Sequence, residues 1–589
     1  MLQITVVLII SILLMLPMGK YLYHIATRAH TFGDPVFDRV DNLIYKVIGV
    51  KNRGLTGMNW QKYIMTLLLT NAVMVVIGYF ILRLQAMPFL NPNQIPGMEQ
   101  GLALNTVVSF ITNTNLQDYS GESSLSYLSQ MIVIIFMMFT SAASGFAAAM
   151  AFIRGLSGKV TDMGNFYADF IRIITRVLLP LSILGAMILM SQGVPQTLMH
   201  NLTVHTVEGK LQDIALGPVA ALEIIKHLGT NGGGFFGANS AMPFENPTIL
   251  TNIIEMLSMT LLPGGVLVAF GLMVSDRHKE KNRTIVANTS PLSALYPKKR
   301  HKVWLGSQAK PLFIVMSVLF LLGLGAILWS EFQGNPILKH LGLSQAMGSM
   351  EGKETRFGVV MSGLFTEITT AFTTGSVNNM HDSLTPLSGG VAMMNMMLNV
   401  VFGGKGVGLM NMVIFVILTV FICGLMIGHT PVYLGKKIEG KEMKLTAMAI
   451  IVHPLIVLVF SAIAVSVAAG VAGISNPGNH GLSQIVYQYT SSSSNNGSGF
   501  EGLKDNTLFW NVTAGIAMFV GRYVTLILQL AIVASLMAKQ KVNDSIGSLK
   551  TDTMTFTTVL FVIVIVISAL TFLPVLVLGP IAEFLKMRG

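Results

Sequence analysis

The sequence has little charge and almost no cysteine. Only 11% of its 589 residues are Asp, Glu, Lys or Arg, and Cys423 is the single cysteine. One thiol excludes an intramolecular disulfide framework, and its apolar neighbours favour a buried small residue. The low charge, with 52% hydrophobic residues and a mean hydropathy of +0.65, excludes the composition of an ordinary soluble domain.

Motifs of nucleotide chemistry are also absent. Neither a GxxxxGK[ST] phosphate-binding loop nor a DKTG phosphorylation motif occurs in the chain. The short alternating segments of a membrane β-barrel are missing as well. These absences favour an all-α membrane protein that binds no nucleotide, so that any ATP chemistry belongs to another chain.

Long apolar stretches are abundant. A helix needs about 20 apolar residues to cross the roughly 30 Å hydrocarbon core of a bilayer. Ten segments meet this requirement, one of them interrupted, and we therefore predict about ten transmembrane helices. The predicted spans are 2–19, 60–83, 128–153, 173–191, 248–274, 311–330, 388–427 (broken), 446–471, 508–537 and 555–580.

The distribution of the basic residues predicts the orientation. The net charge is +11, but most Lys and Arg residues follow the odd-numbered spans. The positive-inside rule makes those loops cytoplasmic and both termini extracytoplasmic, so that nucleic acid is not an expected partner. The densest basic run, 275–302, reads either as a solvated loop near anionic lipid headgroups or as a docking segment for a cytosolic partner.

One unit recurs four times: an apolar span, a short amphipathic run, a polar segment rich in Thr, Asn and Gly, and another apolar span. The polar segments read SFITNTNLQDYSGE, HLGTNGGGFFGAN, TTAFTTGSVNNMHDS and YTSSSSNNGSGFEG. The run before each is long enough only for a half-helix. Four such units predict pore loops that enter the membrane and return on the external side.

The four loops are interpreted as a cation filter. Non-helical backbone survives at membrane depth only where protein buries it or where it lines a watery path. In a potassium filter, rings of carbonyl oxygens replace the water shell of the ion, and half-helix C-termini favour a cation. Glycines 232–234 would then present oxygen. The alternatives are a phosphate loop, disfavoured by the missing motif, and a plain Gly-rich turn, disfavoured by the fourfold recurrence.

Several longer motifs carry a family resemblance. The segments TNTNLQDYSGE, LGTNGGGFFGANS, FENPT, MEGKETRFG, NMHDS, FGGKGVG, MIGHTPVYLGKKI and NNGSGF together resemble the A subunit of the Kdp potassium-transporting ATPase. The resemblance extends from about residue 55 to the C-terminus. It implies a bacterial or archaeal inner-membrane protein that selects potassium, while a P-type B subunit hydrolyses ATP and C and single-helix F subunits complete the complex.

The resemblance also implies the site residues. It places the filter at Asn113, Thr114, Asn115, Thr230, Asn231, Gly232, Thr373, Thr374, Gly375, Asn495, Asn496 and Gly497. Gln117 matches a position associated with the place where ions enter. The third loop has Thr374 where family members often carry cysteine, which leaves the local ligand field in question. Because Asn115 stands where the second loop has Gly232, the ring cannot be chemically fourfold.

The seventh predicted span is split by FGGKGVG, residues 402–408, since glycines interrupt a helix. We interpret Gly403, Gly404, Lys405 and Gly406 as a gate beneath the filter, with Lys405 as a positive barrier. The alternative is a tolerated kink whose lysine reaches toward the interface. Arg522, inside the ninth span, is expected either to set an electrostatic step toward the partner or to form a structural salt bridge.

The overall prediction is an all-α protein with four pseudo-symmetric helix–pore loop–helix repeats around a central filter and one extra helix at each end. It would be the potassium-binding subunit of an ATP-driven uptake pump and no enzyme on its own. A stand-alone potassium channel or an ion-coupled symporter is the alternative. The predicted division is 1–59 (N-terminal helix and loop), 60–154 (repeat 1), 170–275 (repeat 2), 276–309 (basic loop), 310–428 (repeat 3), 445–538 (repeat 4) and 555–589 (C-terminal helix).

Overall fold

The computed structural model describes residues 2–50, 56–158, 162–275, 305–542 and 550–588. The predicted basic loop at 275–302 therefore lies, apart from its first residue, outside the described residues. Within them, ten helices are long and apolar enough to cross a membrane, as predicted. They are Leu2–Ala26, Trp60–Leu84, Tyr127–Ser157, Phe166–Ser191, Ile249–Val274, Ala309–His340, Gly404–Ile427, Gly440–Ser466, Leu508–Met537 and Met554–Arg588.

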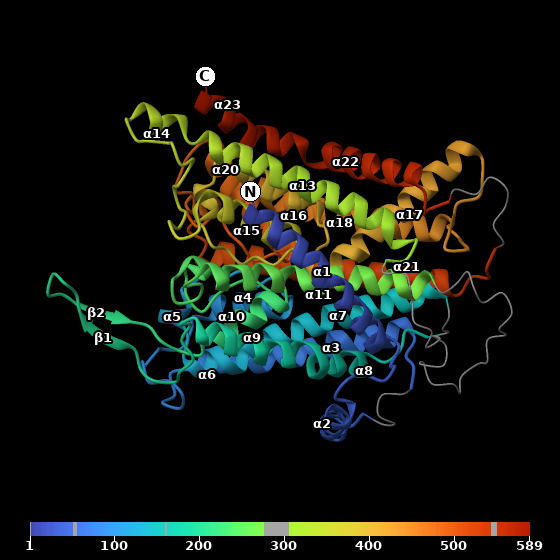
Figure 1. Cartoon of the computed structure of the whole chain (residues 1–589), viewed down its shortest axis with the longest axis horizontal. Helices are drawn as coiled ribbons and strands as arrows, with labels where there is room; N and C mark the ends of the chain where they lie inside the picture. The colour runs from blue at the N-terminus through green and yellow to red at the C-terminus, as the bar shows by residue number, and fades with distance from the viewer. Residues whose placement is uncertain (1, 51–55, 159–161, 276–304, 543–549, 589) are drawn as a thin grey trace.

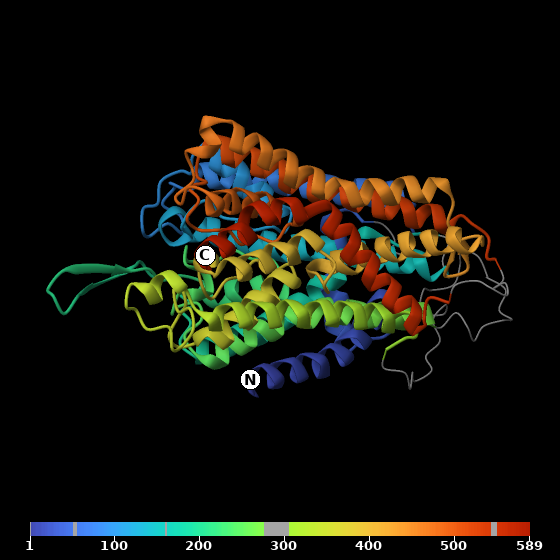
Figure 2. The ribbon, with the colours of Figure 1, turned by 90° about the horizontal axis from the view of Figure 1, so that it is seen from above.

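The long helices run along a common direction and form one bundle (Figures 1 and 2). Their element bounds are α1 Leu2–Ala26, α3 Trp60–Leu84, α7 Phe136–Ser157, α8 Phe166–Ile173, α9 Leu179–Ser191, α11 Ile249–Ser275, α13 Ala309–Gln333, α16 Pro386–Leu398, α17 Val407–Ile427, α18 Gly440–Ser466, α21 Leu508–Met537, α22 Met554–Leu576 and α23 Ala582–Arg588. Leu321 and Leu322 are more than half exposed on the outer face of α13. Such apolar outer surface requires hydrocarbon as its surroundings.

Four short helices precede the four polar loops. They are α4 Gln100–Ile111, α10 Val219–Leu228, α15 Gly358–Ala371 and α20 Asn479–Ser494. At 1.5 Å per residue, even the longest reaches only about 24 Å, so none of them crosses the bilayer. All four lie in the half of the molecule that also carries the β1–β2 hairpin (Figure 1). Each ends directly before its polar loop, as expected for half-helices.

The fourth span begins earlier than the predicted residue 173. Its first part, α8, contains polar side chains that obscured it in the sequence. The Asp169 carboxylate receives two hydrogen bonds from the buried Arg154 guanidinium, at 2.9 and 3.1 Å. Because the charges pair inside the protein, polar residues are accommodated in a spanning helix.

The seventh span is interrupted between α16 and α17, at the predicted segment 402–408. Helix α16 ends at its C-cap, Asn399, which has a positive φ angle. Phe402, Gly403, Lys405 and Gly406 also have positive φ angles, so the chain does not become α-helical again until α17 begins at Val407. One 3₁₀ turn, Gly404–Gly406, lies in the gap. Both helices pack inside the bundle, so the interruption lies within the protein, where irregular backbone can find partners.

Several smaller elements were not expected from the sequence. They are α2 Asp34–Val47, α5 Gly121–Ser124, α6 Tyr127–Ser129, α14 Pro336–His340, α19 Ala468–Val471, the π-helical turns Gln130–Ile135, Ile174–Leu178 and Val577–Ile581, the 3₁₀ turns Asn239–Ala241 and His381–Ser383, and the strands β1 Leu202–His205, β2 Leu211–Ile214, β3 Val432–Tyr433 and β4 Lys436–Lys437. The strands form two antiparallel hairpins. The hairpin β1–β2 projects from one end of the bundle, and α2 lies across the direction of the long helices (Figure 1). The boundaries of the four repeats stay a prediction.

Candidate ion-conducting site

The four polar loops share one backbone pattern. In each loop, the first and third predicted residues have positive φ angles, and the second does not. The first positions are Asn113, Thr230, Thr373 and Asn495, and the third are Asn115, Gly232, Gly375 and Gly497. Non-glycine residues rarely adopt this conformation. Its recurrence at matching positions shows that the four loops are built alike.

The loops also form a closed ring. A Cβ atom added to Gly232 would lie 2.5 Å from the Thr374 carbonyl oxygen, so the second loop lies directly against the third. One added to Gly375 would lie 2.0 Å from the Asn496 carbonyl oxygen, and one added to Gly497 would lie 2.0 Å from that of Thr114. These separations leave no room for a side chain. Glycine is therefore required sterically as well as by its φ angle.

Side-chain amides fix the loops to one another. The Asn113 side chain donates to the Thr230 carbonyl at 2.9 Å and accepts from the Asn231 side chain at 2.7 Å. The Asn495 side chain donates to the Thr114 hydroxyl at 3.0 Å. Because these bonds join different loops, the asparagine side chains hold the ring together.

Gln117 lies just beyond the ring and spans the first two loops. Its side-chain oxygen accepts from the Gly234 backbone N–H at 2.7 Å, and its amide donates to the Gly234 carbonyl at 3.1 Å. This two-bond contact holds the outer rim of the ring. The predicted role at the place where ions enter stays a prediction.

A buried charged cluster lies behind the second loop. The Lys226 ammonium contacts Glu223 at 2.7 Å and Glu245 at 2.8 Å, and Glu245 in turn accepts from the Phe236 backbone N–H at 2.7 Å. All three ionic side chains are fully buried. Removing one partner of such a pair leaves an uncompensated buried charge. The cluster therefore braces the glycine-rich loop from behind.

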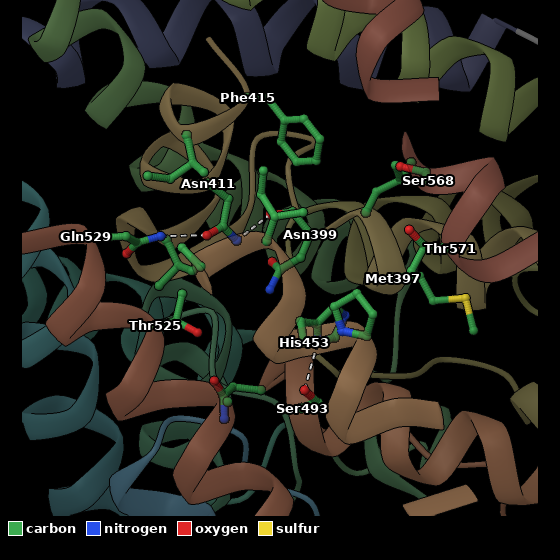
Figure 3. A pocket seen from close by; sticks show the side chains of 18 of the residues that line it. Met397, Asn399, Asn411, Phe415, His453, Ser493, Thr525, Gln529, Ser568 and Thr571 are labelled. Carbon is green, nitrogen blue, oxygen red and sulfur yellow. Dashed lines mark hydrogen bonds between the residues drawn. The ribbon is translucent and has the colours of Figure 1, made fainter. Parts of the chain in front are cut away.

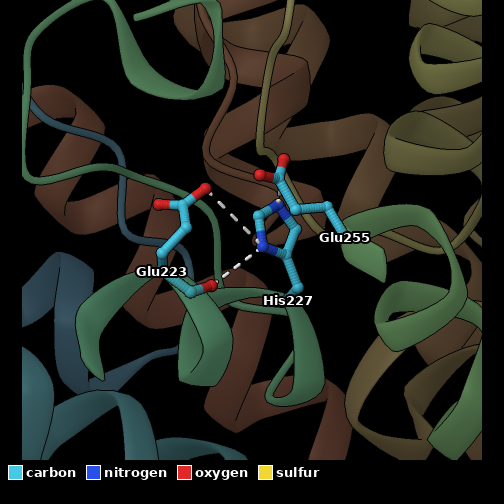
Figure 4. A group of neighbouring side chains, drawn as sticks. All are labelled: Glu223, His227 and Glu255. Carbon is cyan, nitrogen blue, oxygen red and sulfur yellow. Dashed lines mark hydrogen bonds and ion pairs between the residues drawn. The ribbon is translucent and has the colours of Figure 1, made fainter. Parts of the chain in front are cut away.

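His227 connects this cluster to the third loop. Its Nδ1 donates to the Glu223 carbonyl and its Nε2 lies 2.8 Å from the Ser376 hydroxyl, directly after Gly375. Figure 4 shows the His227 imidazole between the Glu223 and Glu255 side chains. The Glu255 carboxylate lies 3.5 Å from its Nε2. The three side chains are close enough to share a metal ion. Since the histidine nitrogens and Glu223 already have partners within the protein, the geometry favours bracing.

Lys405 contacts two loops of the ring. Its ammonium donates to the Asn113 carbonyl at 2.9 Å and also to the Asn495 carbonyl. These are the first residues of the first and fourth loops. The side chain is 1% exposed, so its charge is held by loop carbonyls and does not reach toward water. A fixed ammonium at this place competes directly with a cation for the same oxygens.

Arg522 lies beside Lys405. A Cβ atom added to Gly145 would meet both side chains, at 2.5 Å from the Arg522 guanidinium and 2.8 Å from Lys405 Cβ. The two terminal nitrogens of Arg522 are buried and make no hydrogen bond among the described residues. The structural salt bridge considered for Arg522 is therefore not found within the described part of the chain.

A cavity of about 60 Å³ opens below the ring and borders Arg522 and Asn495. Figure 3 shows its polar lining: Gln529 donates to Asn411, Asn411 donates to the Asn399 carbonyl, and His453 contacts Ser493. The lining helices are α16, α17, α18, α20, α21 and α22. The cavity thus extends sideways from the ring toward the fourth repeat and the C-terminal helix.

A pair of carboxyl groups lies close to the outer rim. Asp118, which follows Gln117, is 5% exposed and lies within electrostatic reach of Asp505. Burial, and then the charge of Asp505, raise the pKa of Asp118 well above its usual range, whereas burial raises the pKa of Asp505 to about 6. Burial therefore favours the neutral form of both carboxyl groups.

His480, at the start of α20, ties the third loop to the C-terminal helix. Its ring lies 3.0 Å from Asp382 and 2.9 Å from Glu583. Burial lowers the pKa of His480, but the hydrogen bonds to these two carboxylates outweigh burial and raise the pKa to about 10. The histidine is therefore charged at neutral pH and holds α23 in place.

This contact predicts a pH dependence of stability. The histidine stabilises fully below its unfolded pKa of about 6.5, and the contribution is lost as pH rises through the folded pKa. We expect the purified complex to lose on the order of 2 kcal/mol of local stability between about pH 7 and 10. Thermal unfolding at several pH values measures the loss, and His480→Gln should remove this dependence. An equal decline in the variant would contradict the prediction.

Sequence reasoning missed the charged brace and the carboxyl pair. Lys226 and Glu245 stand 19 positions apart on either side of the second loop, and nothing in their spacing indicates contact. The available signal was the presence of charged residues close to the predicted pore loops. Charges at membrane depth need partners, so contacts among them could have been expected.

Within the described residues, ten apolar helices and four half-helices, whose loops close one ring, define a membrane protein of the pore-loop class. A solved structure of the potassium transporter TrkH from Vibrio parahaemolyticus shares this fold, with a TM-score of 0.52 and 14% identity over 90% of this chain and 98% of that one.

The sequence itself identifies the family. The family model of the potassium-transporting ATPase A subunit matches residues 5–585. The potassium-binding subunit of a potassium-transporting ATPase from Clostridium acetobutylicum is 54% identical over 586 residues, covering 100% of both chains. That from Geobacillus kaustophilus is 51% identical, covering 100% of this chain and 99% of the relative. The chain belongs to the potassium-transporting ATPase A subunit family, which confirms the predicted family.

Proposed function

We propose that this chain binds and translocates potassium as one subunit of an ATP-driven uptake pump. The closed ring of four loops, sealed below by Lys405, carries the proposal. The carbonyl oxygens of the predicted filter residues replace the water shell of the ion, because a hard monovalent cation prefers oxygen. Thr hydroxyls add further oxygen. The C-terminal ends of α4, α10, α15 and α20 contribute negative dipoles that favour a cation.

The ion leaves the ring sideways. Lys405 blocks the straight route with a fixed positive charge, and the glycine-rich break gives this part of the chain room to move. The cavity that borders Arg522 supports a lateral path, since it lies just below the ring and between membrane-spanning helices. Arg522, with a free guanidinium edge among the described residues, would set an electrostatic step along that path.

Energy must come from another chain. A carbonyl ring lowers the barrier in both directions and cannot move ions uphill by itself. The partners that fit are a P-type B subunit, a C subunit and a single-helix F subunit in a bacterial inner membrane. The charge distribution supports extracytoplasmic termini and an external ring mouth.

Potassium uptake into liposomes that contain the purified assembly tests this function. We expect uptake to require ATP on the accessible side and to discriminate against sodium. Uptake that proceeds without ATP and follows the membrane potential would identify a channel, and uptake that follows a proton or sodium gradient a symporter. Either result would contradict the proposal.

A further inference from the structure

A second cavity borders the glycine-rich break at 402–408, here called the gate segment, through Phe402. It has a volume of about 100 Å³ and is bounded by α1, α11 and α13. Figure 2 shows α1 at the edge of the bundle. The residues at its mouth, Ile12 and Leu321, are 44% and 55% exposed. This groove therefore opens from the bundle toward the surface that faces the bilayer.

The groove is mainly apolar, with three hydroxyl-bearing residues in its lining. Ser11 and Thr260 line it, but Thr260 donates to Ser11 at 3.2 Å, so that these hydroxyls satisfy one another. The remaining lining is aliphatic or aromatic apart from Ser317. Water needs two to four polar partners to be held in a cavity. Water is thus a poor occupant of this groove.

Two aromatic rings form the floor. Phe372 and Phe402 are stacked in parallel with ring centroids 5.0 Å apart, and both side chains are less than 10% exposed. Phe372 directly precedes Thr373 of the third loop, and Phe402 directly precedes Gly403 of the helix break. An occupant of the groove therefore touches the two residues that connect to the ring and to the gate segment.

We propose that this groove holds an acyl chain of a membrane lipid. The mouth lies among the apolar outer faces of spanning helices, where hydrocarbon is the surrounding medium. No hydrophobic transfer drives the chain in, since lipid tails are as apolar as leucine. Filling a void still gains dispersion contacts along its whole lining. The high local concentration of tails then keeps the groove filled.

A lipid in the groove would also affect transport, and this effect rests on the proposed function of the segment 402–408 as a gate. With a tail in place, the Phe402 ring is supported from both sides and the adjacent backbone is held closed. Without it, Phe402 has space to leave the stack. The lipid would therefore stabilise the blocked state of the pathway.

Photolabelling tests the lipid directly. The intact complex is placed in phosphatidylethanolamine and phosphatidylglycerol vesicles that contain a phospholipid with a diazirine in its acyl chain, and labelled residues are identified by mass spectrometry. We expect labels on Phe320 and Phe372, which are 5% and 2% exposed and reachable through the groove. Labels confined to outer residues such as Leu322 would overturn the proposal.

Ser317→Phe and Val318→Phe form a matched pair. Ser317 lines the groove, whereas its neighbour Val318 is 39% exposed on the outer surface. Filling the groove should remove the labels on Phe320 and Phe372 and leave Leu322 labelled, and Val318→Phe should change neither. A photoreactive residue at Ile12 that captures a partner chain's helix would overturn the lipid in favour of protein. Since labelling needs no transport, failure of the pump function would be seen separately.

Discussion

Gly375→Ala is expected to lower potassium uptake by the intact complex at least about tenfold and to weaken its preference over sodium. The new methyl group would lie 2.0 Å from the Asn496 carbonyl oxygen, and the residue has a φ angle of +88°. Overpacking costs about 1–3 kcal/mol and the left-handed backbone about 1–2 kcal/mol more. Because the atom that must move is a ring oxygen, the strain appears as altered ion binding.

Gly515→Ala is the matched control for this substitution. Gly515 lies in α21, and nothing approaches within 4 Å of a Cβ atom added there. The control should fold, assemble and transport as the parent does. Potassium and sodium competition in ATP-driven uptake measures the difference. Unchanged selectivity in a correctly assembled Gly375→Ala complex would show that the ring does not select the ion.

Lys405→Met is expected to create a potassium leak that needs no ATP. The ammonium now stands on the Asn113 and Asn495 carbonyl oxygens at the inner end of the ring. At an effective dielectric constant of about 20, a unit charge 4 Å from a potassium ion raises its energy by about 4 kcal/mol. Removing it should speed passive flux by roughly ten- to a thousandfold, since 1.4 kcal/mol is a factor of ten.

The leak is measured as potassium flux in the absence of ATP, in liposomes that contain the complex and no ionophore, after a potassium gradient is imposed. Lys405→Arg keeps the charge and should remain closed, and Lys310→Met at an exposed position of α13 controls for loss of a lysine. Methionine has nearly the length of lysine, so the site keeps its bulk. If Lys405→Met weakens potassium binding without any leak, the lysine serves only to support the ring.

The predictable part of the site followed from local pattern. In the segment Thr230–Gly232, the first two residues carry side-chain oxygen and the glycine allows a positive φ angle. The sequence therefore predicted a loop that presents oxygen to a cation. Lys405 was expected in a broken helix because glycines surround it. That its ammonium reaches the Asn113 carbonyl, a residue 292 positions earlier, depends on packing between repeats and had no local signal.

The sequence by itself determined the membrane location, the ten apolar helices and the four interrupted loops, because hydrocarbon thickness and backbone hydrogen bonding constrain each segment separately. The family motifs then assigned the chain to its family. The tertiary structure alone decided which loop touches which, where Lys226 finds its carboxylates and where the groove beside Phe402 opens. These features are contacts between distant segments, and their energies depend on distances that no single stretch of sequence contains.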